Sequence, residues 1–148
     1  MIDVANRQRR VAVSAAQVRA VVAAAFEQEG AGEPDVSVAL VDDATIAAVN
    51  ERWLGHAGPT DSIAFSLHDD PGPDGLRGEV VASAETALRE ARARGLDPRG
   101  ELLLYVAHGV LHLLGWEDGS PRARAAMNAR ARRAVRRGLR AAAGRARP

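Results

Sequence analysis

Hydrophobic and polar side chains alternate along several short stretches of the chain, as they do in β-strands with one buried face. In residues 35–41, Val36, Val38 and Leu40 fall on one face and the residues between them on the other. Shorter apolar runs elsewhere have the same character. The pattern predicts four strands, at residues 2–5, 35–41, 62–67 and 79–83.

Between these strands apolar residues recur every three or four positions, which is the spacing of a helix with one buried face. Ser14 is a candidate N-cap for the first such stripe. The second stripe follows Asp42 or Asp43 and assigns Trp53 to the core. The predicted helices are 14–29, 42–53, 84–94, 99–114 and 121–137. Strands interspersed with helices indicate a mixed sheet with helices packed on it.

Residues 108–118 read HGVLHLLGWED and place two histidines inside an apolar, helix-patterned segment. His108 and His112 are one helical turn apart, so their imidazoles lie on one face and can converge on one ion. Gly115 is a natural helix end, and the returning chain can bring Asp118 to the same point. Three ligands with one open position are typical of catalytic zinc, so the spacing predicts one divalent ion, zinc first, that activates water.

The same pair also has a purely structural interpretation. Two histidines one turn apart arise in packed helices, where hydrogen bonds satisfy them, and spacing alone leaves both interpretations open. Gly109 stands where the zinc-protease motif HExxH places its glutamate general base. Proteolysis by that mechanism would therefore lack its proton acceptor.

The segment HGVLHLLGWED resembles the signature of the YbeY family of bacterial endoribonucleases and ribosomal RNA maturation factors, which usually reads HGxLHLxGYDH. Residues 49–56 and 59–66, VNERWLGH and PTDSIAFS, resemble the family block LNxxYRGKDxPTDVLSF. Residues 78–83, GEVVAS, are similar to the family strand GDIVIS. The resemblance implies an α+β fold, a mixed sheet of about four strands with packed helices and a zincin-like metal cleft.

Two positions depart from the family pattern. The third metal ligand, usually histidine, is Asp118 here, and a carboxylate oxygen is an accepted zinc ligand. The arginine that often follows the aromatic residue of the second block is Leu54 here. If that arginine holds phosphate in relatives, this chain must obtain the charge elsewhere or has lost activity.

Other polar residues are candidates for the same site. The resemblance implies that Thr60 and Asp61 line the metal cleft, with Asp61 as a catalytic proton acceptor or a support for a histidine; turn chemistry explains the pair equally well. Glu101 lies seven residues before His108 and could orient an imidazole, or could be a surface charge near the helix start. His56 and His68 fall on loops, with His56 as a reserve ligand.

Length and composition indicate one small domain. The chain has 148 residues, long enough for one core, and no cysteine, which excludes disulfides and thiolate ligands and fits a reducing compartment. We expect the domain to span residues 1–138 and a basic, frayed tail to span 139–148. The first ten residues lack the apolar region of a signal peptide, and no membrane-spanning run follows, so we expect a cytoplasmic protein without membrane contact.

The net charge of +1 hides an uneven distribution of charge along the chain. All nineteen carboxylates lie before Gly119, and ten arginines and no carboxylate follow it. Arginine suits phosphate through its planar fork of donors, so we expect this arm to contact RNA, although a solvated helix explains it too. The candidate RNA-contacting residues are Arg122, Arg124, Arg130, Arg132, Arg133, Arg136 and Arg137.

The resemblance implies a metal-dependent endoribonuclease that prefers single strands and acts in ribosomal RNA maturation and ribosome quality control. His108, His112 and Asp118 would hold the ion, and the expected partners are ribosomal RNA, the small ribosomal subunit and its assembly factors, with no DNA. Two alternatives remain. One is a non-catalytic ribosome-assembly module, and the other is a metallohydrolase of a non-RNA substrate, with a peptidase disfavoured by Gly109.

Overall fold

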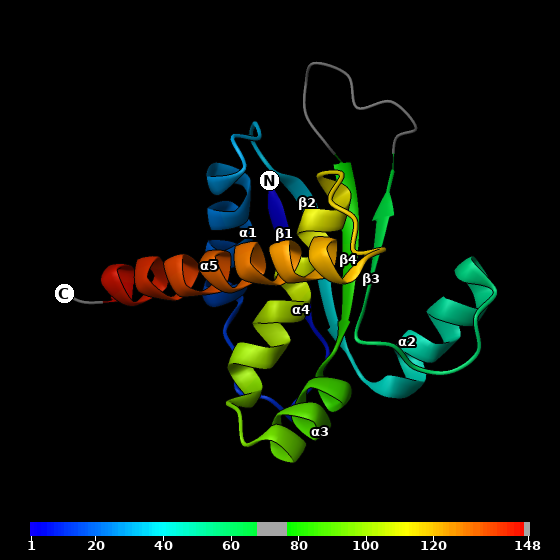
Figure 1. The fold of residues 1–148 in the computed structure, drawn as a ribbon. Coiled ribbons are helices and arrows are strands. Elements are labelled where there is room, and N and C mark those ends of the chain that lie inside the picture. The colour runs from blue at the N-terminus through cyan, green and yellow to red at the C-terminus, as the bar shows by residue number, and fades with distance from the viewer. Residues whose placement is uncertain (68–76, 147–148) are drawn as a thin grey trace.

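The computed structural model describes residues 1–67 and 77–146 (Figure 1). The elements follow one another as β1 (Ile2–Asn6), α1 (Ala15–Gln28), β2 (Asp35–Val41), α2 (Asp43–Val49), η1 (Asn50–Leu54, a π-helix), β3 (Ser62–Ser66), β4 (Arg77–Ser83), α3 (Ala84–Arg94), α4 (Pro98–Leu113) and α5 (Pro121–Ala146). The four predicted strands are confirmed to within two residues at their ends. His68 lies outside the described residues.

The four strands form one mixed sheet in the order β1-β2-β4-β3. β1, β2 and β4 are parallel to one another, and β3 is antiparallel to β4. The alternation predicted for β2 is confirmed, because Val36, Val38 and Leu40 are all buried in the main core. The predicted α+β class with a four-stranded mixed sheet is therefore correct.

Helices cover the two faces of the sheet unequally. α1 and α4 pack on one face, and α5 crosses over both of them (Figure 1). A Cβ atom added at Gly138 of α5 would lie 2.6 Å from the Cα of Val21, so the backbones of α5 and α1 are in direct contact. On the other face α2 covers only a small cluster built on Val41, Ile46 and Ile63. The larger core therefore lies beneath the helix that carries both motif histidines.

Two predicted helix starts are confirmed by their caps. Ser14 accepts a hydrogen bond from the backbone N–H of Gln17 at 3.1 Å, and the Gln17 side chain accepts one from the Ser14 N–H at 3.0 Å. Asp42 accepts one from the backbone N–H of Thr45 at 2.8 Å. These short polar side chains satisfy donors that the first helical turn leaves unpaired.

The last helix is longer than predicted. α5 continues to Ala146, whereas the sequence pattern suggested an end near Arg137. Leu139 still packs against the core, and the alanines and arginines that follow favour helix. Within the described residues, no helix combines the length and the apolar character that crossing a membrane requires.

Trp53 is not a core residue, contrary to the prediction. Its side chain is 64% exposed. The helical stripe that starts at Ile46 would have buried it, but the chain changes to π-helix at Asn50. Hydrogen bonds from residue i to i+5 widen the turn, so residues after Asn50 rotate away from the face that Ile46 buries.

Candidate functional site

The end of α4 brings the second motif histidine close to Asp118. α4 ends at Leu113, and Gly115 has a φ of 96°, a left-handed conformation that glycine adopts without steric cost. The predicted helix end at Gly115 is therefore confirmed. After the reversal, the Trp116 carbonyl oxygen lies 3.1 Å from Nδ1 of His112, and Oδ2 of Asp118 lies 3.7 Å from its Nε2.

The contact with Trp116 determines how the His112 ring carries its proton. A carbonyl oxygen only accepts hydrogen bonds, so Nδ1 of His112 must donate. In the neutral ring, Nε2 then holds the lone pair, on the side of Asp118. An imidazole fixed in this way by a backbone carbonyl is the arrangement that commonly supports a metal ligand.

The first motif histidine has a different partner. Nε2 of His108 lies 2.7 Å from Oδ1 of Asn128 on α5. Within residues 1–67 and 77–146, no three His, Asp or Glu side chains lie together as a metal site. His112 and Asp118 fit a shared divalent ion, whereas Nε2 of His108 is held by Asn128 and could bind the ion only after leaving it. The zincin-like cleft therefore stays a prediction, as does the use of zinc.

His108 opens into a groove of about 520 Å³ between α4, α5, α3 and the loop before β3. The two polar residues that the resemblance assigned to the cleft, Thr60 and Asp61, both line this groove. Arg132 of α5 lines it as well, so one arginine of the basic arm shares the groove with His108. The groove therefore combines an imidazole, a carboxylate and a guanidinium within reach of one ligand.

Asp61 makes the turn contacts that the alternative interpretation expected. Its Oδ1 accepts hydrogen bonds from the Ser62 backbone N–H at 2.6 Å and from the Thr60 hydroxyl at 3.4 Å. The other carboxylate oxygen, Oδ2, receives no hydrogen bond from the part of the chain that the structure describes. Asp61 thus stabilises the turn with one oxygen and presents the other to solvent in the groove.

Glu101 adopts neither of the arrangements considered from the sequence. It is only 4% exposed, so it is not a surface charge. Its carboxylate accepts a hydrogen bond from the Arg94 guanidinium, and within the described residues no hydrogen bond or ion pair joins it to either motif histidine. Arg94 comes from the preceding helix, and spacing along α4 could not reveal that pairing.

Two further residues of the groove carried no clear sequence signal. Tyr105 lies one helical turn before His108 on α4 and lines the same groove. Burial raises the pKa of the Tyr105 hydroxyl, and the charge of Glu101 adds to this effect, so the group stays a neutral donor. Asn128 sits twenty residues from His108, and only the packing of α5 on α4 joins them.

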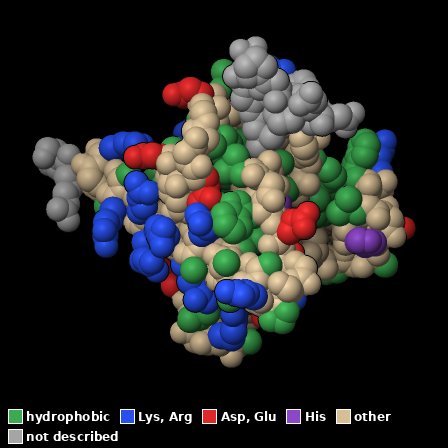
Figure 2. Space-filling model, turned by 45° about the horizontal axis from the view of Figure 1, so that its top comes forward, with side chains coloured by type: hydrophobic (Ala, Val, Ile, Leu, Met, Phe, Trp, Pro, Cys, Tyr) green, Lys and Arg blue, Asp and Glu red, His purple; other side chains and the backbone are tan. Residues whose placement is uncertain are grey.

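The basic arm is largely solvent-facing. Of its seven candidate RNA-contacting arginines, six are exposed: Arg122, Arg124, Arg132, Arg133, Arg136 and Arg137. Figure 2 shows most of the arginine side chains of this view gathered on one side of the molecule, where α5 runs. Such a concentration of positive charge is suited to a polyanion.

Arg130 differs from the other arginines of the arm. Its guanidinium lies 3.0 and 3.1 Å from the two carboxylate oxygens of Glu29 and 4.1 Å from the centre of the Trp116 ring. Trp116 donates its ring N–H to the same carboxylate at 2.8 Å. Arg130 therefore joins α5 to the end of α1 and to the turn after α4, so its charge is engaged within the molecule.

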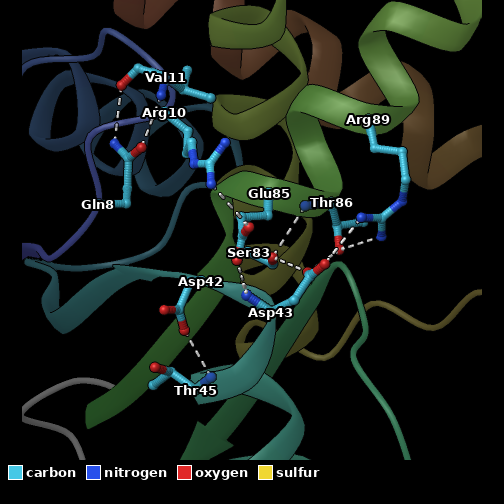
Figure 3. Close-up of polar contacts among 10 residues, drawn as sticks. All are labelled: Gln8, Arg10, Val11, Asp42, Asp43, Thr45, Ser83, Glu85, Thr86 and Arg89. Atoms are coloured by element: carbon cyan, nitrogen blue, oxygen red, sulfur yellow. Dashed lines mark hydrogen bonds and ion pairs between the residues drawn. The ribbon is translucent and has the colours of Figure 1, made fainter.

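A second polar network joins α2 to α3, one of the helices that bound the groove (Figure 3). Asp43 accepts hydrogen bonds from the hydroxyls of Ser83 and Thr86, both at 2.6 Å, and from Arg89 at 3.0 Å. In return, the Asp43 backbone N–H donates to Glu85 at 2.9 Å. These hydrogen bonds join the start of α2 to the start of α3. Thr86, which takes part in them, also lines the groove.

Replacing Asp43 with asparagine should cost about 1–2 kcal/mol of unfolding free energy at neutral pH. Burial raises the pKa of Asp43, but hydrogen bonds from Ser83, Thr86 and Arg89 outweigh it and hold the pKa below its usual 3.8. A lowered folded-state pKa stabilises the fold above the unfolded value, and this contribution disappears as pH falls through the folded value.

Urea unfolding of both proteins from pH 7 to pH 3 measures this effect. We expect the difference to shrink below about pH 4, where the wild-type carboxylate protonates. Asp3→Asn removes an exposed carboxylate of β1 and serves as the control, with little change expected at any pH. A constant difference at every pH would contradict the role of charge at Asp43.

Gly109 faces the sheet rather than the groove. A Cβ atom at this position would lie 2.5 Å from Cγ1 of Val80 on β4. α4 therefore packs so closely on β4 that only glycine fits. The position that carries the glutamate of zinc proteases has no room here for any side chain, which further disfavours the peptidase alternative.

Comparison with known proteins identifies the same family that the sequence motifs resemble. The family model described as Endoribonuclease YbeY matches residues 3–138. An Endoribonuclease YbeY from Rhodopirellula baltica is 47% identical over 106 residues, which are 70% of this chain and 54% of that protein. Another, from Moorella thermoacetica, is 39% identical over 121 residues, 76% of this chain and 78% of that protein.

The solution structure of TM1509 from Thermotoga maritima has a similar fold. It superposes with a TM-score of 0.65 over 95% of this chain and 93% of that one, at 23% sequence identity. This chain spans only about half the length of the Rhodopirellula relative. The family match nevertheless covers β2, β3 and β4, β1 from Asp3 onwards, and most of the helices, including the histidine motif. The chain therefore belongs to the YbeY family of endoribonucleases.

Proposed function

We propose that this protein is an endoribonuclease that cleaves single-stranded RNA with the help of one divalent ion, with zinc as the first candidate. The observation that carries the proposal is the His112 ring, whose Nδ1 donates to Trp116 and whose Nε2 faces Asp118. Family membership supports the reaction. We further propose that the substrate is ribosomal RNA, with action in ribosomal RNA maturation and quality control, beside the small subunit and assembly factors in the cytoplasm.

His108, His112 and Asp118 would hold the ion. When bound, such an ion lowers the pKa of water towards neutrality and stabilises negative charge that develops on the phosphate. The chain's own residues have separate tasks. Arg132 would bind a phosphate of the strand in the groove, and Tyr105 would donate a hydrogen bond as a neutral hydroxyl. The attacking group is either water or the neighbouring ribose hydroxyl.

Asp61 would accept the proton of the attacking group at Oδ2, the oxygen that the turn leaves unused. Asp61→Asn keeps the acceptor at Oδ1 and removes the base, so we expect kcat to fall by about 100-fold or more with KM nearly unchanged. Thr60→Val is the matched control, because it removes only the 3.4 Å hydrogen bond to Oδ1. Equal losses in the two variants would mean that Asp61 only supports the turn.

The experiment that tests the proposed function is a cleavage assay with the purified chain. Single-stranded RNA, duplex RNA and casein are incubated with the protein as prepared, after chelation, and after zinc is restored. We expect cleavage of single-stranded RNA alone, lost on chelation and recovered with zinc. The engagement of His108 by Asn128 favours the non-catalytic alternative, in which RNA binds but none of the three substrates is cut.

A further inference from the structure

Trp53 is the aromatic side chain that the fold leaves uncovered. All five aromatic residues lie within the described residues, and Phe26 and Tyr105 are buried while Phe65 and Trp116 are half-buried. Trp53 is 64% exposed, and Leu54 beside it is 45% exposed. Exposure of a large apolar ring forgoes the stabilisation that its burial would provide, and two neighbouring exposed apolar side chains make a candidate contact surface.

A positive charge accompanies the ring. The guanidinium of Arg52 lies 5.3 Å from the centre of the Trp53 ring. Arg52 forms no ion pair with a carboxylate of the described residues, so its charge is available to a ligand. The sequence places Leu54 where the family often has arginine, and Arg52 supplies a charge two residues earlier on the same π-helix.

The segment that carries the ring is held in place. The side chain of Asn50, which is buried, donates to the Gly58 carbonyl oxygen at 3.0 Å and ties η1 to the chain that follows. His56 N–H donates to the Asn50 carbonyl oxygen at 3.3 Å. From Trp53 the chain reaches Asp61 in eight residues, so the Cα atoms of Trp53 and of the groove residue Asp61 lie within about 28 Å of each other.

We propose that Arg52 and Trp53 form a stacking subsite for an unpaired base of the RNA strand that enters the His108 groove. An aromatic face stacks on any base, and a nearby arginine binds the phosphate and adds a cation–π contribution. Only unpaired bases expose the faces that such stacking needs, so the subsite also favours single strands. This inference rests on the proposed function, because it assumes an RNA substrate.

Binding of a twelve-residue oligouridine and of an abasic strand of equal length tests the subsite. We expect Trp53→Ala to weaken oligouridine binding by about 5-fold to 100-fold, to leave abasic binding unchanged, and Trp53→Phe to restore most of the loss. Arg52→Gln should weaken binding to both strands and reduce the salt slope by about 0.7. Leu67→Ala, which removes a side chain of 56% exposure, is the control.

Fluorescence gives a second readout that does not depend on cleavage. In a Trp116→Phe background Trp53 is the remaining tryptophan. We expect oligouridine to quench its emission to saturation and the abasic strand to leave it unchanged. If the wild type binds and cuts RNA but Trp53→Ala behaves identically, the inference is wrong and the proposed function stands. The exposed Trp53 ring would then serve to bind a protein partner. A wild type that binds no RNA would overturn both.

Discussion

Replacing His112 with alanine should leave the purified protein without its divalent ion and lower the rate of single-stranded RNA cleavage by more than about 100-fold. The ring is fixed by Trp116 with Nε2 towards Asp118, so the substitution removes the nitrogen that would bind the ion. Elemental analysis of the purified variant measures the ion directly. We expect about one ion per wild-type chain and little in the variant.

His56→Ala is the matched control for this prediction. His56 is an exposed loop residue, and its removal should leave the ion and the cleavage rate unchanged. Asp118→Ala should behave as His112→Ala does, because both side chains would hold the same ion. Full occupancy in Asp118→Ala together with loss in His56→Ala would show that His56 is the third ligand.

The second large effect concerns the exposed arginines of α5. Changing Arg132, Arg133 and Arg136 together to glutamine should weaken binding of single-stranded RNA by on the order of 100-fold at 0.1 M salt. Each phosphate contact contributes about 0.7 to the slope of log affinity against log salt concentration, so loss of three should reduce the slope by about 2. Glutamine keeps helix propensity, which separates charge from folding.

Arg130→Gln is the control within the same helix. Because Arg130 is engaged by Glu29 and Trp116, its replacement should lower the free energy of unfolding and leave the salt slope nearly unchanged. Affinity measured across a salt series, with thermal unfolding of each variant, distinguishes the two effects. A triple variant with an unaltered slope and an intact fold would mean that α5 is only a solvated helix.

Local patterns predicted most of the secondary structure. Alternation located the strands, because a strand with one buried face needs apolar residues at every second position. Ser14, Asp42 and Gly115 marked helix ends, since caps and left-handed turns depend on residues close in sequence. The motif from His108 to Asp118 predicted correctly that the chain reverses after Gly115, which places Asp118 beside His112.

Features that depend on contacts between distant segments could not be read in this way. Arg94 forms a hydrogen bond with the carboxylate of Glu101, and Asn128 forms one with His108, because α3 and α5 pack against α4. Trp53 was misassigned since one π-helical turn changes the face on which later residues fall. Arg130 carries the same charge as its neighbours, and its contacts with Glu29 and Trp116 depend on how α5 packs on α1 and on the turn after α4.

The central claim is that His108, His112 and Asp118 converge on one ion, although His108 contacts Asn128 in the structure described here. A crystal structure of the chain grown with zinc tests it most directly. We expect one metal peak, confirmed by anomalous scattering, about 2.0–2.2 Å from a ring nitrogen of each histidine and from an oxygen of Asp118. Zinc absent from this position, with His108 still on Asn128, would contradict the account.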